Sequence, residues 1–367
     1  MKKICFFSGD ITRSGGTERV SILIANELKK VTQYQICFLS LVEQKERPFY
    51  DLDPEIKRFA LGKKWLSPGP GYFPLIPRLH HFLKTEKIDL IIDIDIVLDV
   101  LSVPAGIGLK TKVVSWEHSN CEYELGQGYR RVILKTFTKR TDWIVTLTPG
   151  DAKSFQRVMK RTERVSAIYN PIENKKESDS RRMPAFSERE NALITVARLV
   201  PGKGFDLLIR VAERVLRDFP DWKWYLCGDG PELEMLEQFR DDAGLKERFI
   251  LCGLVSNVED YLAKSKLFVF TSRAEGLPMV LLEARKMGVP CVSFDIPTGP
   301  ADIIREGVDG YLIAPFDLND MIGKVSGLLA NPDKLEEMGK KAAEDLETFS
   351  MESVIGKWRE LLGRLLE

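Results

Sequence analysis

Two carboxylates stand on either side of a helix start in the second half of the chain. An apolar strand predicted at 267–270 leads into a polar loop with Glu275, and Pro278 then opens a helix predicted over 279–287. Proline suits the first helical position because the backbone N–H has no partner there. A glycine-containing loop before a helix presents free N–H groups at the positive end of the helix dipole, which favours an anion. The segment therefore predicts a phosphate site with Glu275 before it and Glu283 inside the helix.

The separation of these carboxylates indicates the size of the ligand. Glu275 and Glu283 are eight residues apart, which at a helical rise of ~1.5 Å per residue is at most ~12 Å. A diphosphate with a sugar at each end has a similar length. We therefore predict a nucleotide-sugar, with its diphosphate at the helix start, its ribose at Glu283 and its transferred sugar at Glu275. The alternative is a buried strand–helix unit with two surface carboxylates.

Two cations follow an earlier strand of the same half. The strand is predicted at 192–197, and the loop after it, RLVPGKG at 198–204, carries Arg198 and Lys203. Charge-assisted hydrogen bonds from such cations to a diphosphate are worth roughly 1.5–3 kcal/mol each. Arg198 and Lys203 could therefore neutralise a diphosphate leaving group without a metal. Two solvated surface cations are the alternative.

The N-terminal half begins with a similar strand, glycine loop and helix. A strand is predicted at 3–7 and a helix at 17–30, with Gly15 and Gly16 between them and Thr17 as a possible helix cap. The paired glycines would let the backbone approach a bound group closely. The loop lacks GxxxxGK[ST] and the full GxGxxG spacing, which disfavours a nucleoside triphosphate or a dinucleotide.

A histidine follows another predicted strand, at 112–115. His118 lies in the sequence WEHSN at 116–120. The carboxyl end of a parallel strand faces the crevice in which α/β folds bind ligands. We therefore predict a functional His118, although a lone histidine is more often structural.

These motifs resemble those of a known family. Glu275, seven intervening residues and Glu283, followed by the turn Gly288-Val289-Pro290, resemble the donor-site motif of retaining glycosyltransferases of family 4, which have the GT-B fold. Arg198 and Lys203 have the RxxxxKG spacing of this family. The resemblance extends over nearly the whole chain, and the WEHSN segment is similar to bacterial exopolysaccharide and lipid-linked oligosaccharide transferases of the amylovoran-type subgroup.

The resemblance implies roles for individual residues. In the family, the N-terminal glycine loop faces the donor diphosphate and the acceptor, and a histidine at the position of His118 lies near the transferred sugar. The implied catalytic residues are His118, Glu275, Arg198 and Lys203. The implied donor-binding residues are Gly15, Gly16, Thr17, Arg198, Lys203, Glu275, Gly276, Leu277, Pro278, Met279 and Glu283.

Length and periodicity indicate two α/β domains. The chain has 367 residues, and strands alternate with helices in both halves, which predicts parallel sheets covered on both faces. The fold class expected from this alternation is α/β with two Rossmann-like domains that face each other, and the resemblance implies that they form a GT-B fold with a cleft between them. We expect an acceptor-binding domain at 1–172, a polar linker at 173–190, a nucleotide-sugar-binding domain at 191–348, and a C-terminal helix at 349–367 that packs back on the first domain.

Charge is distributed unevenly. The net charge is zero overall, but residues 1–174 carry 27 Lys and Arg against 20 Asp and Glu, a net charge of +7, and the remainder carries −7. The segment 129–164 is the most basic, and 63–84 mixes aromatic with basic residues. Such surfaces suit an anionic membrane or a lipid-linked substrate, and ordinary solvated helix faces are the alternative.

An Asp-x-Asp pair offers an alternative donor site. The apolar strand predicted at 88–96 carries Asp93 and Asp95, which resemble the metal-binding signature of the other glycosyltransferase fold, GT-A. Carboxylates two apart on a strand point the same way and could hold Mn²⁺. Because the donor site is already accounted for in the second half, we expect no metal and no cofactor.

Composition indicates the cellular compartment in which we expect the protein. The chain is 44% hydrophobic, and its six cysteines form no CxxC pair, which is typical of a reduced cytosolic protein. No signal peptide is expected, and the apolar run 88–109 is interrupted by four aspartates, so it does not read as a membrane span. We expect a cytoplasmic protein, peripheral at the inner face of the membrane, with no nucleic-acid partner.

The sequence therefore predicts a metal-independent retaining glycosyltransferase of the hexosyltransferase type. The favoured donor is a UDP-sugar, and the favoured acceptor is a lipid-linked glycan of cell-surface polysaccharide or lipopolysaccharide biosynthesis in bacteria. A GT-B-fold UDP-sugar epimerase and a non-catalytic partner subunit are the alternatives. The sequence leaves open the sugar, the base, the acceptor linkage and the oligomeric state.

Overall fold

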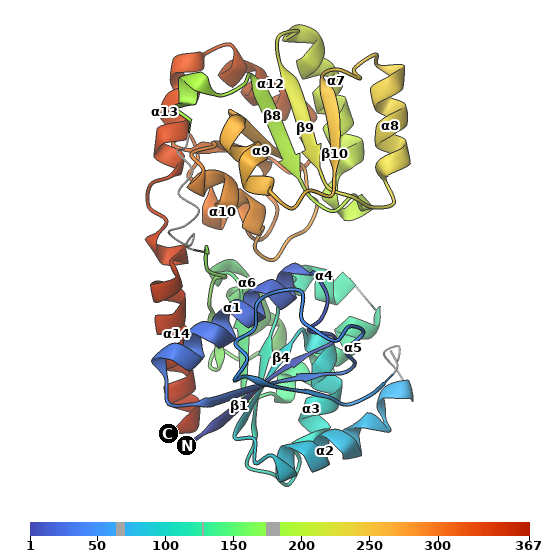
Figure 1. Ribbon diagram of the computed structural model, residues 1–367, viewed down its shortest axis with the longest axis vertical. Coiled ribbons are helices and arrows are strands. Elements are labelled where there is room, and N and C mark those ends of the chain that lie inside the picture. Colours follow the sequence, from blue (N-terminus) through green and yellow to red (C-terminus); the bar gives the residue numbers. More distant parts are fainter. Residues whose placement is uncertain (64–69, 127, 174–183) are drawn as a thin grey trace. The chain divides into compact units, whose positions relative to one another are not determined.

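The computed structural model describes residues 1–63, 70–126, 128–173 and 184–367 (Figure 1). Contacts divide the chain into two units, one of Met1–Pro171 with Phe349–Glu367 and one of Ile172–Thr348. The last helix, predicted to pack on the first domain, belongs to the first unit. The predicted linker at 173–190 falls largely on 174–183, which lie outside the described residues.

The first unit contains a fully parallel sheet of seven strands in the order β3-β2-β1-β4-β5-β6-β7. Its strands are β1 (Lys3–Ser8), β2 (Gln35–Ser40), β3 (Lys57–Ala60), β4 (Leu90–Ile94), β5 (Lys112–Trp116), β6 (Trp143–Thr146) and β7 (Val165–Ala167). The central strands are buried along almost their whole length, as expected for a sheet covered on both faces. β3 was not predicted from the sequence.

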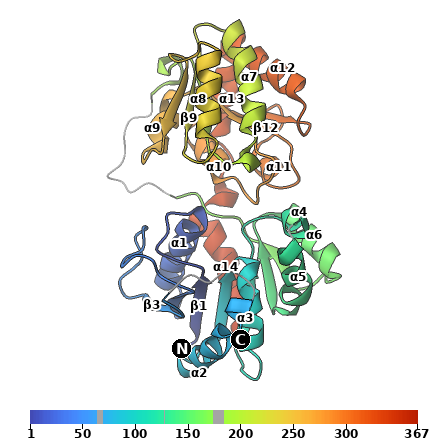
Figure 2. The same ribbon diagram turned by 90° about the vertical axis from the view of Figure 1, so that its right-hand side faces the viewer.

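Helices surround this sheet and complete the core of the first unit. They are α1 (Gly16–Val31), α2 (Leu75–Thr85), α3 (Asp99–Ala105), α4 (Cys121–Gly126), α5 (Gly128–Thr136), α6 (Pro149–Met159) and α14 (Met351–Leu366). The C-terminal helix α14 lies beside α1 (Figure 2). The fully buried Trp358 of α14 contacts Trp116 at the end of β5, with ring centroids 4.9 Å apart.

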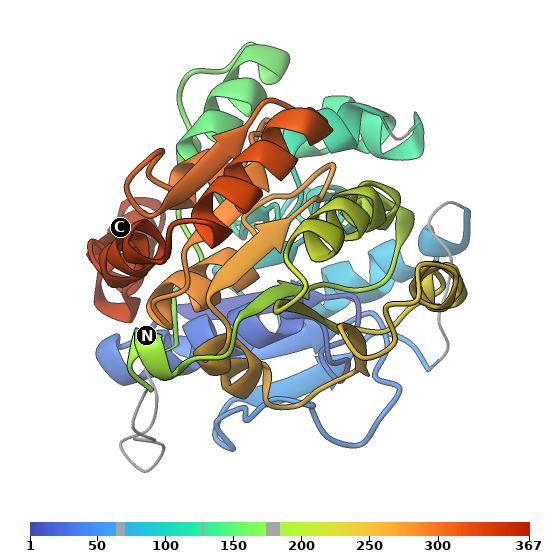
Figure 3. The same ribbon diagram turned by 90° about the horizontal axis from the view of Figure 1, so that it is seen from above.

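The second unit contains a parallel sheet of six strands in the order β10-β9-β8-β11-β12-β13. Its strands, which Figure 3 shows from above, are β8 (Ala192–Val196), β9 (Lys223–Cys227), β10 (Phe249–Gly253), β11 (Leu267–Phe270), β12 (Cys291–Phe294) and β13 (Gly310–Ile313). The order reverses direction at β8 and β11, which pair with each other. Ligands of open α/β sheets bind at such a switch point, beyond the carboxyl ends of the strands.

Helix α7 (Phe205–Asp218) of the second unit has a strongly amphipathic sequence. In α7, buried residues recur every three or four positions, at Phe205, Leu208, Val211, Ala212 and Val215, and this stripe contributes to the core between the sheet and the helices. The helices are α7 (Phe205–Asp218), α8 (Leu233–Asp242), α9 (Val258–Lys264), α10 (Met279–Lys286), α11 (Pro300–Ile303), α12 (Leu318–Leu329) and α13 (Pro332–Ala342).

Candidate functional site

A pocket of about 390 Å³ lies at the carboxyl ends of the central strands of the second unit. Four segments line it: the end of β8 with the loop after it, the end of β9, the residues after β10, and the segment from β11 to α10. The lining residues are Val196, Ala197, Arg198, Lys203, Cys227, Gly228, Asp229, Leu254, Val255, Val258, Phe270, Glu275, Leu277, Pro278, Met279, Val280 and Glu283.

An ion pair joins two of the predicted residues at this pocket. The Lys203 ammonium lies 2.5 Å from Glu275 Oε1, and the side chains are 24% and 12% exposed. Ser272 Oγ donates a second hydrogen bond to the same carboxylate oxygen, at 2.6 Å, and Thr298 Oγ1 donates to the Glu275 carbonyl. Glu275 is therefore held in place through both its side chain and its backbone.

The loop of Lys203 is tied to the loop of Glu275 by backbone contacts. Thr271 Oγ1 donates to the Lys203 carbonyl at 3.1 Å, and Arg273 N donates to the Gly202 carbonyl at 2.9 Å. Gly204 ends the short turn after Lys203 with φ +70°, and a Cβ there would lie 2.2 Å from the Thr271 carbonyl oxygen. Glycine is therefore required at 204, both for its backbone conformation and for the close approach of the two loops.

The backbone on either side of Arg198 packs closely against the turn after β9. A Cβ at Gly228 would lie 1.9 Å from the Ala197 carbonyl oxygen, and Leu199 N donates to the Asp229 carbonyl at 2.9 Å. These contacts hold the end of β8 against the turn after β9. Within the described residues, the exposed Arg198 guanidinium makes no hydrogen bond or ion pair, so its donors remain available to a ligand at the pocket.

Glu283 reaches the pocket from α10, which begins at Met279 with Pro278 as its N-cap. The partly buried Glu283 lies one turn into the helix, as predicted. The loop before α11 packs against the helix start, because a Cβ at Gly299 would lie 2.5 Å from Pro278 Cδ. The start of α10 and the Glu275 loop thus share a support, the segment 298–299.

The pocket gathers most of the donor-binding residues that the sequence predicts. Arg198, Lys203, Glu275 and Glu283 line it together with 277–279, while the buried Gly276 lies between lining residues without lining the pocket itself. Asp229 and the apolar residues after β10 were not predicted. The turn Gly228-Asp229-Gly230 was visible in the sequence, and its position at a strand end was the signal that could have identified Asp229.

The remaining predicted residues belong to the first unit. Gly15 is the N-cap of α1, so Thr17 does not cap the helix as predicted but lies in its first turn. Thr17 Oγ1 instead donates to the buried Glu18 carboxylate at 2.8 Å. A Cβ at Gly15 would lie 2.1 Å from Glu18 Oε2, whereas nothing lies within 4 Å of one at Gly16. A side chain at position 15 would therefore displace the Glu18 carboxylate, and a role of Gly15 in donor binding stays a prediction.

His118 lies two residues beyond β5 and contacts Trp116, with ring centroids 4.4 Å apart. Its side chain is partly buried, and His118 Nε2 is buried without a hydrogen-bond partner among the described residues. Burial lowers the pKa of His118 to about 3. The imidazole is therefore neutral near pH 7 and can exchange a hydrogen bond with a hydroxyl group, but it does not supply a positive charge.

The two aspartates of the alternative metal site do not share one side of a strand. Asp93 is fully buried in β4, accepts a hydrogen bond from Ser102 Oγ, and has a pKa raised to about 7 by burial. Asp95 follows the strand with φ +96°, caps Val97 N at 2.9 Å and pairs with Arg130 at 2.8 Å. The premise of two parallel carboxylates was therefore wrong. Within the described residues, no three His, Cys, Asp or Glu side chains could hold a metal ion.

The basic segment of the first unit divides into buried and exposed residues. Arg130 is buried against Asp95 and Glu124, and Arg161 donates to the carbonyls of Thr141 and Asp142, so these two arginines are structural. The exposed basic residues of the segment are Arg131, Lys135, Lys139, Arg140, Lys153, Arg157, Lys160 and Arg164.

Apolar side chains lie among these exposed cations on α5. Tyr129 and Val132 are 53% and 59% exposed, on the helix that also carries Arg131 and Lys135. Mixed apolar and basic helix surfaces suit a membrane interface. In the part of the chain that the structure describes, no helix is long and apolar enough to cross a membrane.

Comparison with known proteins identifies the family. Residues 176–345 match the family model of the glycosyl transferases group 1, and residues 14–176 match that of glycosyltransferase family 4. A Haemophilus influenzae protein described as an uncharacterized glycosyltransferase is 30% identical over 366 residues, which cover 99% of this chain and 100% of the relative.

More distant relatives have named activities. A Campylobacter jejuni alpha-1,4-N-acetyl-D-galactosaminyltransferase, whose name includes a PP-undecaprenol-linked glycan, is 26% identical across 100% of this chain and 99% of its own length. The amylovoran biosynthesis glycosyltransferase of Erwinia amylovora is also 26% identical, across 99% of this chain and 100% of its own length.

A solved structure has the same fold. The Anabaena protein HepE, in complex with UDP-glucose, superposes with a TM-score of 0.78 at 18% identity, covering 98% of this chain and 99% of that one. The superposition covers both of the parallel-sheet units described above. The predicted family and fold class are thereby confirmed. This chain belongs to the family 4 glycosyltransferases and has the GT-B fold.

Proposed function

We propose that this protein is a retaining, metal-independent hexosyltransferase that uses a UDP-sugar and works in the biosynthesis of a bacterial cell-surface polysaccharide. The observation that carries the proposal is the pocket at the carboxyl ends of β8, β9 and β11. It combines the unengaged Arg198, the Lys203–Glu275 ion pair and Glu283 at one place. Each of these groups matches a different part of a nucleoside diphosphate sugar.

The two cations suit the diphosphate. Arg198 offers a planar guanidinium that makes no hydrogen bond within the described residues, and Lys203 offers an ammonium that is only partly exposed. Guanidinium and ammonium groups bind phosphate oxygens through charge-assisted hydrogen bonds, and they stabilise the negative charge that develops as the diphosphate leaves. We infer that these two residues supply this charge without a metal ion or a cofactor.

The two glutamates suit the sugars at either end of the diphosphate. Glu283, one turn into α10, would accept hydrogen bonds from ribose hydroxyls. Glu275, fixed by Lys203 and Ser272, would accept them from the transferred sugar. Leu254 is 85% exposed at the pocket rim near Val258, and such apolar surface suits the face of a nucleotide base. The UDP-glucose bound by HepE makes uridine the first base to test.

The proposed reaction breaks the bond between the anomeric carbon and the diphosphate oxygen. The acceptor hydroxyl attacks the anomeric carbon on the face from which the diphosphate leaves, so the configuration is retained. A phosphate oxygen of the donor takes the hydroxyl proton, and UDP carries that proton away. The protein contributes orientation and fixed charge, and a neutral His118 would exchange a hydrogen bond with a hydroxyl of the transferred sugar.

For the acceptor we propose a glycan linked to a lipid diphosphate. The Campylobacter relative is named for a PP-undecaprenol-linked glycan. In this chain, α5 and α6 both carry exposed cations, and Tyr129 and Val132 are exposed on α5. Basic residues near an anionic leaflet add about 1 kcal/mol of binding each. The protein would thus work at the cytoplasmic face of the membrane as a peripheral enzyme.

Slow hydrolysis of the donor tests this proposal without knowledge of the acceptor. Purified protein is incubated with a panel of UDP-, GDP- and ADP-sugars in EDTA, and the released nucleoside diphosphate and the anomer of the free sugar are followed by NMR. We expect release from one UDP-sugar, with the anomeric configuration retained. An epimerised sugar as product would favour the UDP-sugar epimerase, and no turnover or binding of any member would favour a non-catalytic subunit.

A further inference from the structure

Helix α10 carries a buried arginine close to the proposed ribose-binding glutamate. Arg285 follows Glu283 by two positions, which places the two side chains on different faces of the helix. Glu283 lines the pocket, whereas the Arg285 side chain is 2% exposed. Burial of a guanidinium costs free energy unless each of its N–H donors has a hydrogen-bond partner. The partners of Arg285 therefore show which segments it connects.

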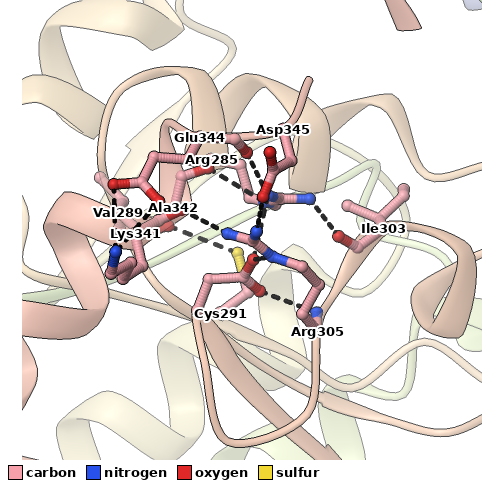
Figure 4. Close-up of polar contacts among 10 residues, drawn as sticks. Arg285, Val289, Cys291, Ile303, Arg305, Lys341, Ala342, Glu344 and Asp345 are labelled. Atoms are coloured by element: carbon pink, nitrogen blue, oxygen red, sulfur yellow. Dashed lines mark hydrogen bonds and ion pairs between the residues drawn. The ribbon is translucent and has the colours of Figure 1, made fainter. Parts of the chain in front are cut away.

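The Arg285 guanidinium contacts three separate segments (Figure 4). Nε donates to the Ala342 carbonyl at 3.0 Å, Nη2 donates to the Glu344 carbonyl at 2.8 Å, and Nη1 donates to the Ile303 carbonyl. Its charge is balanced by the fully buried Asp309, with Nη2 2.9 Å from Asp309 Oδ2. An aliphatic side chain could fill the same space, but it could not make these bonds.

One of these segments supports the other proposed sugar-binding glutamate. Ile303 ends α11, and the loop that precedes α11 contains Thr298 and Gly299. Thr298 Oγ1 donates to the Glu275 carbonyl, and Gly299 lies against Pro278 at the helix start. Arg285 thus belongs to the helix of Glu283 and also bonds to α11, the helix whose preceding loop supports the backbone of Glu275.

A second of these segments, with Ala342 and Glu344, lies where the chain leaves the second unit. Ala342 ends α13, and the second unit itself ends at Thr348, before the chain enters α14 of the first unit. Arg305 adds to the same junction, because its Nη2 donates to the Lys341 carbonyl at 2.7 Å and its Nε contacts Asp309 Oδ2 at 2.6 Å. We call residues 341–348 the crossing segment.

We propose that Arg285 is a positioning residue that fixes Glu283 and Glu275 relative to each other and links donor binding at the pocket to the order of the crossing segment. The proposal rests on the proposed function, in which a nucleoside diphosphate contacts Glu283. A donor that hydrogen-bonds to Glu283 restrains α10. Because Arg285 bonds to the carbonyls of residues 342 and 344, these residues are then restrained as well. Binding at the pocket therefore reduces the motion of the segment through which the second unit joins the first.

Hydrogen exchange with and without UDP tests this link in the full-length protein. The variants are Arg285→Met, which fills the space without the bonds, and Arg285→Lys, which keeps the charge for Asp309 but not the three carbonyl bonds. Arg305→Met is the comparison variant: it removes another Asp309 partner and a bond to the crossing segment, but it leaves α10 untouched. UDP affinity is measured by calorimetry, and exchange is compared at equal saturation with UDP.

In the wild type we expect UDP to slow exchange both in the pocket segment 271–283 and in the crossing segment. Arg285→Met should bind UDP about tenfold more weakly, the scale of one lost hydrogen bond, and lose the protection of the crossing segment while it keeps that of 271–283. Arg285→Lys should recover thermal stability but not this protection. Arg305→Met should speed exchange of the crossing segment without UDP, because it loses the bond to the Lys341 carbonyl, but it should keep the slowing that UDP causes.

Two results would overturn the inference, and they are distinguishable. If Arg285→Met shows the wild-type protection of the crossing segment, Arg285 is only a structural residue. If that variant does not fold, wild-type protection in Arg285→Lys leads to the same conclusion. If wild-type protein shows no UDP-dependent protection even in 271–283 and binds no other nucleoside diphosphate, the proposed function itself is wrong, and the inference falls with it.

Discussion

The ammonium of Lys203 lies 2.5 Å from Glu275 Oε1, although 72 residues separate the two in sequence. Lys203, the proposed cation for the diphosphate, and Glu275, the proposed acceptor of sugar hydrogen bonds, therefore form an ion pair. A partly buried carboxylate without this cation would repel a diphosphate, so the effect of losing Lys203 depends on whether Glu275 is charged.

This pairing predicts non-additive effects on catalysis. We expect Lys203→Ala to lower kcat by about 10²–10³-fold, the scale of one lost electrostatic contact in the transition state. In the double variant with Glu275→Gln, the combined loss should be clearly smaller than the product of the single losses. The measurement is a double-mutant cycle on donor hydrolysis, with Arg198→Ala and Glu275→Gln as the comparison pair. Strictly multiplicative effects for Lys203 and Glu275 would contradict a shared role.

The two glutamates should affect different kinetic parameters. Glu283 is proposed to hold ribose in the ground state and the transition state alike, so Glu283→Ala should mainly weaken donor binding. Glu275 is proposed to hold the sugar as charge develops, so Glu275→Ala should mainly lower kcat. Calorimetry with UDP separates the two, since only Glu283→Ala should lose UDP affinity. An unchanged UDP affinity in that variant would remove Glu283 from the ribose.

The buried Asp93 predicts a pH dependence of stability. Burial raises the pKa of Asp93 from 3.8 to about 7, and the pKa of Asp99 beside it is also raised. The folded protein therefore holds a proton that the unfolded chain has released, and the free energy of unfolding falls as pH rises through about 7. Asp93→Asn should remove this part of the dependence, because an amide keeps a donor without titrating.

Urea unfolding of the wild type and Asp93→Asn between about pH 5.5 and 8.5, a window centred on the raised pKa, measures this effect. The exposed Asp333→Asn is the matched control and should follow the wild type. A wild-type stability that rises steadily across this range would show that Asp93 is ionised in the folded protein.

Membrane binding should depend on the exposed cations and not on all basic residues of their segment. Reversal of Lys135, Lys139, Arg157 and Lys160 to Glu should abolish binding to anionic vesicles, because each cation adds about 1 kcal/mol near such a surface. Binding of the wild type should weaken steeply with salt, which screens charges beyond a Debye length of ~8 Å. Vesicle sedimentation at low and high salt is the measurement.

The matched control reverses two arginines exposed on α7 of the second unit, Arg210 and Arg217. This variant should bind vesicles as the wild type does, and both variants should keep their affinity for UDP. Wild-type protein that ignores anionic vesicles at low salt would contradict the membrane proposal and leave the basic helices as solvated surfaces.

The sequence could predict the pocket residues because parallel sheets place them together. Arg198 follows one strand and Glu275 follows another, and the carboxyl ends of parallel strands meet at one edge. The alternation of strands and helices was sufficient to infer this arrangement. The edge strand β3 (Lys57–Ala60) was missed because two of its four residues are charged and none is buried, which is typical of sheet edges but resembles a loop in sequence.

Contacts between distant charged residues could not be predicted from spacing. Arg130 and Arg285 look like surface cations in sequence, yet both are buried against carboxylates and carbonyls supplied by other elements. Asp95 adopts φ +96° because Val97 N and Arg130 bind its side chain, and no local pattern indicates this. The cap of α1 was also predicted wrongly from spacing. Gly15 is the N-cap, and the Thr17 hydroxyl donates to the buried Glu18 carboxylate, whose position the sequence does not show.

The central claim is that the second unit recognises a nucleoside diphosphate through fixed cations without a metal. Calorimetric titration of UDP and UMP in EDTA tests it most directly, with the wild type and Arg198→Ala. The account predicts that the wild type binds UDP more tightly than UMP and that Arg198→Ala loses most of this difference. Failure of the wild type to bind UDP until Mn²⁺ is added, or an unchanged preference for UDP in Arg198→Ala, would contradict it.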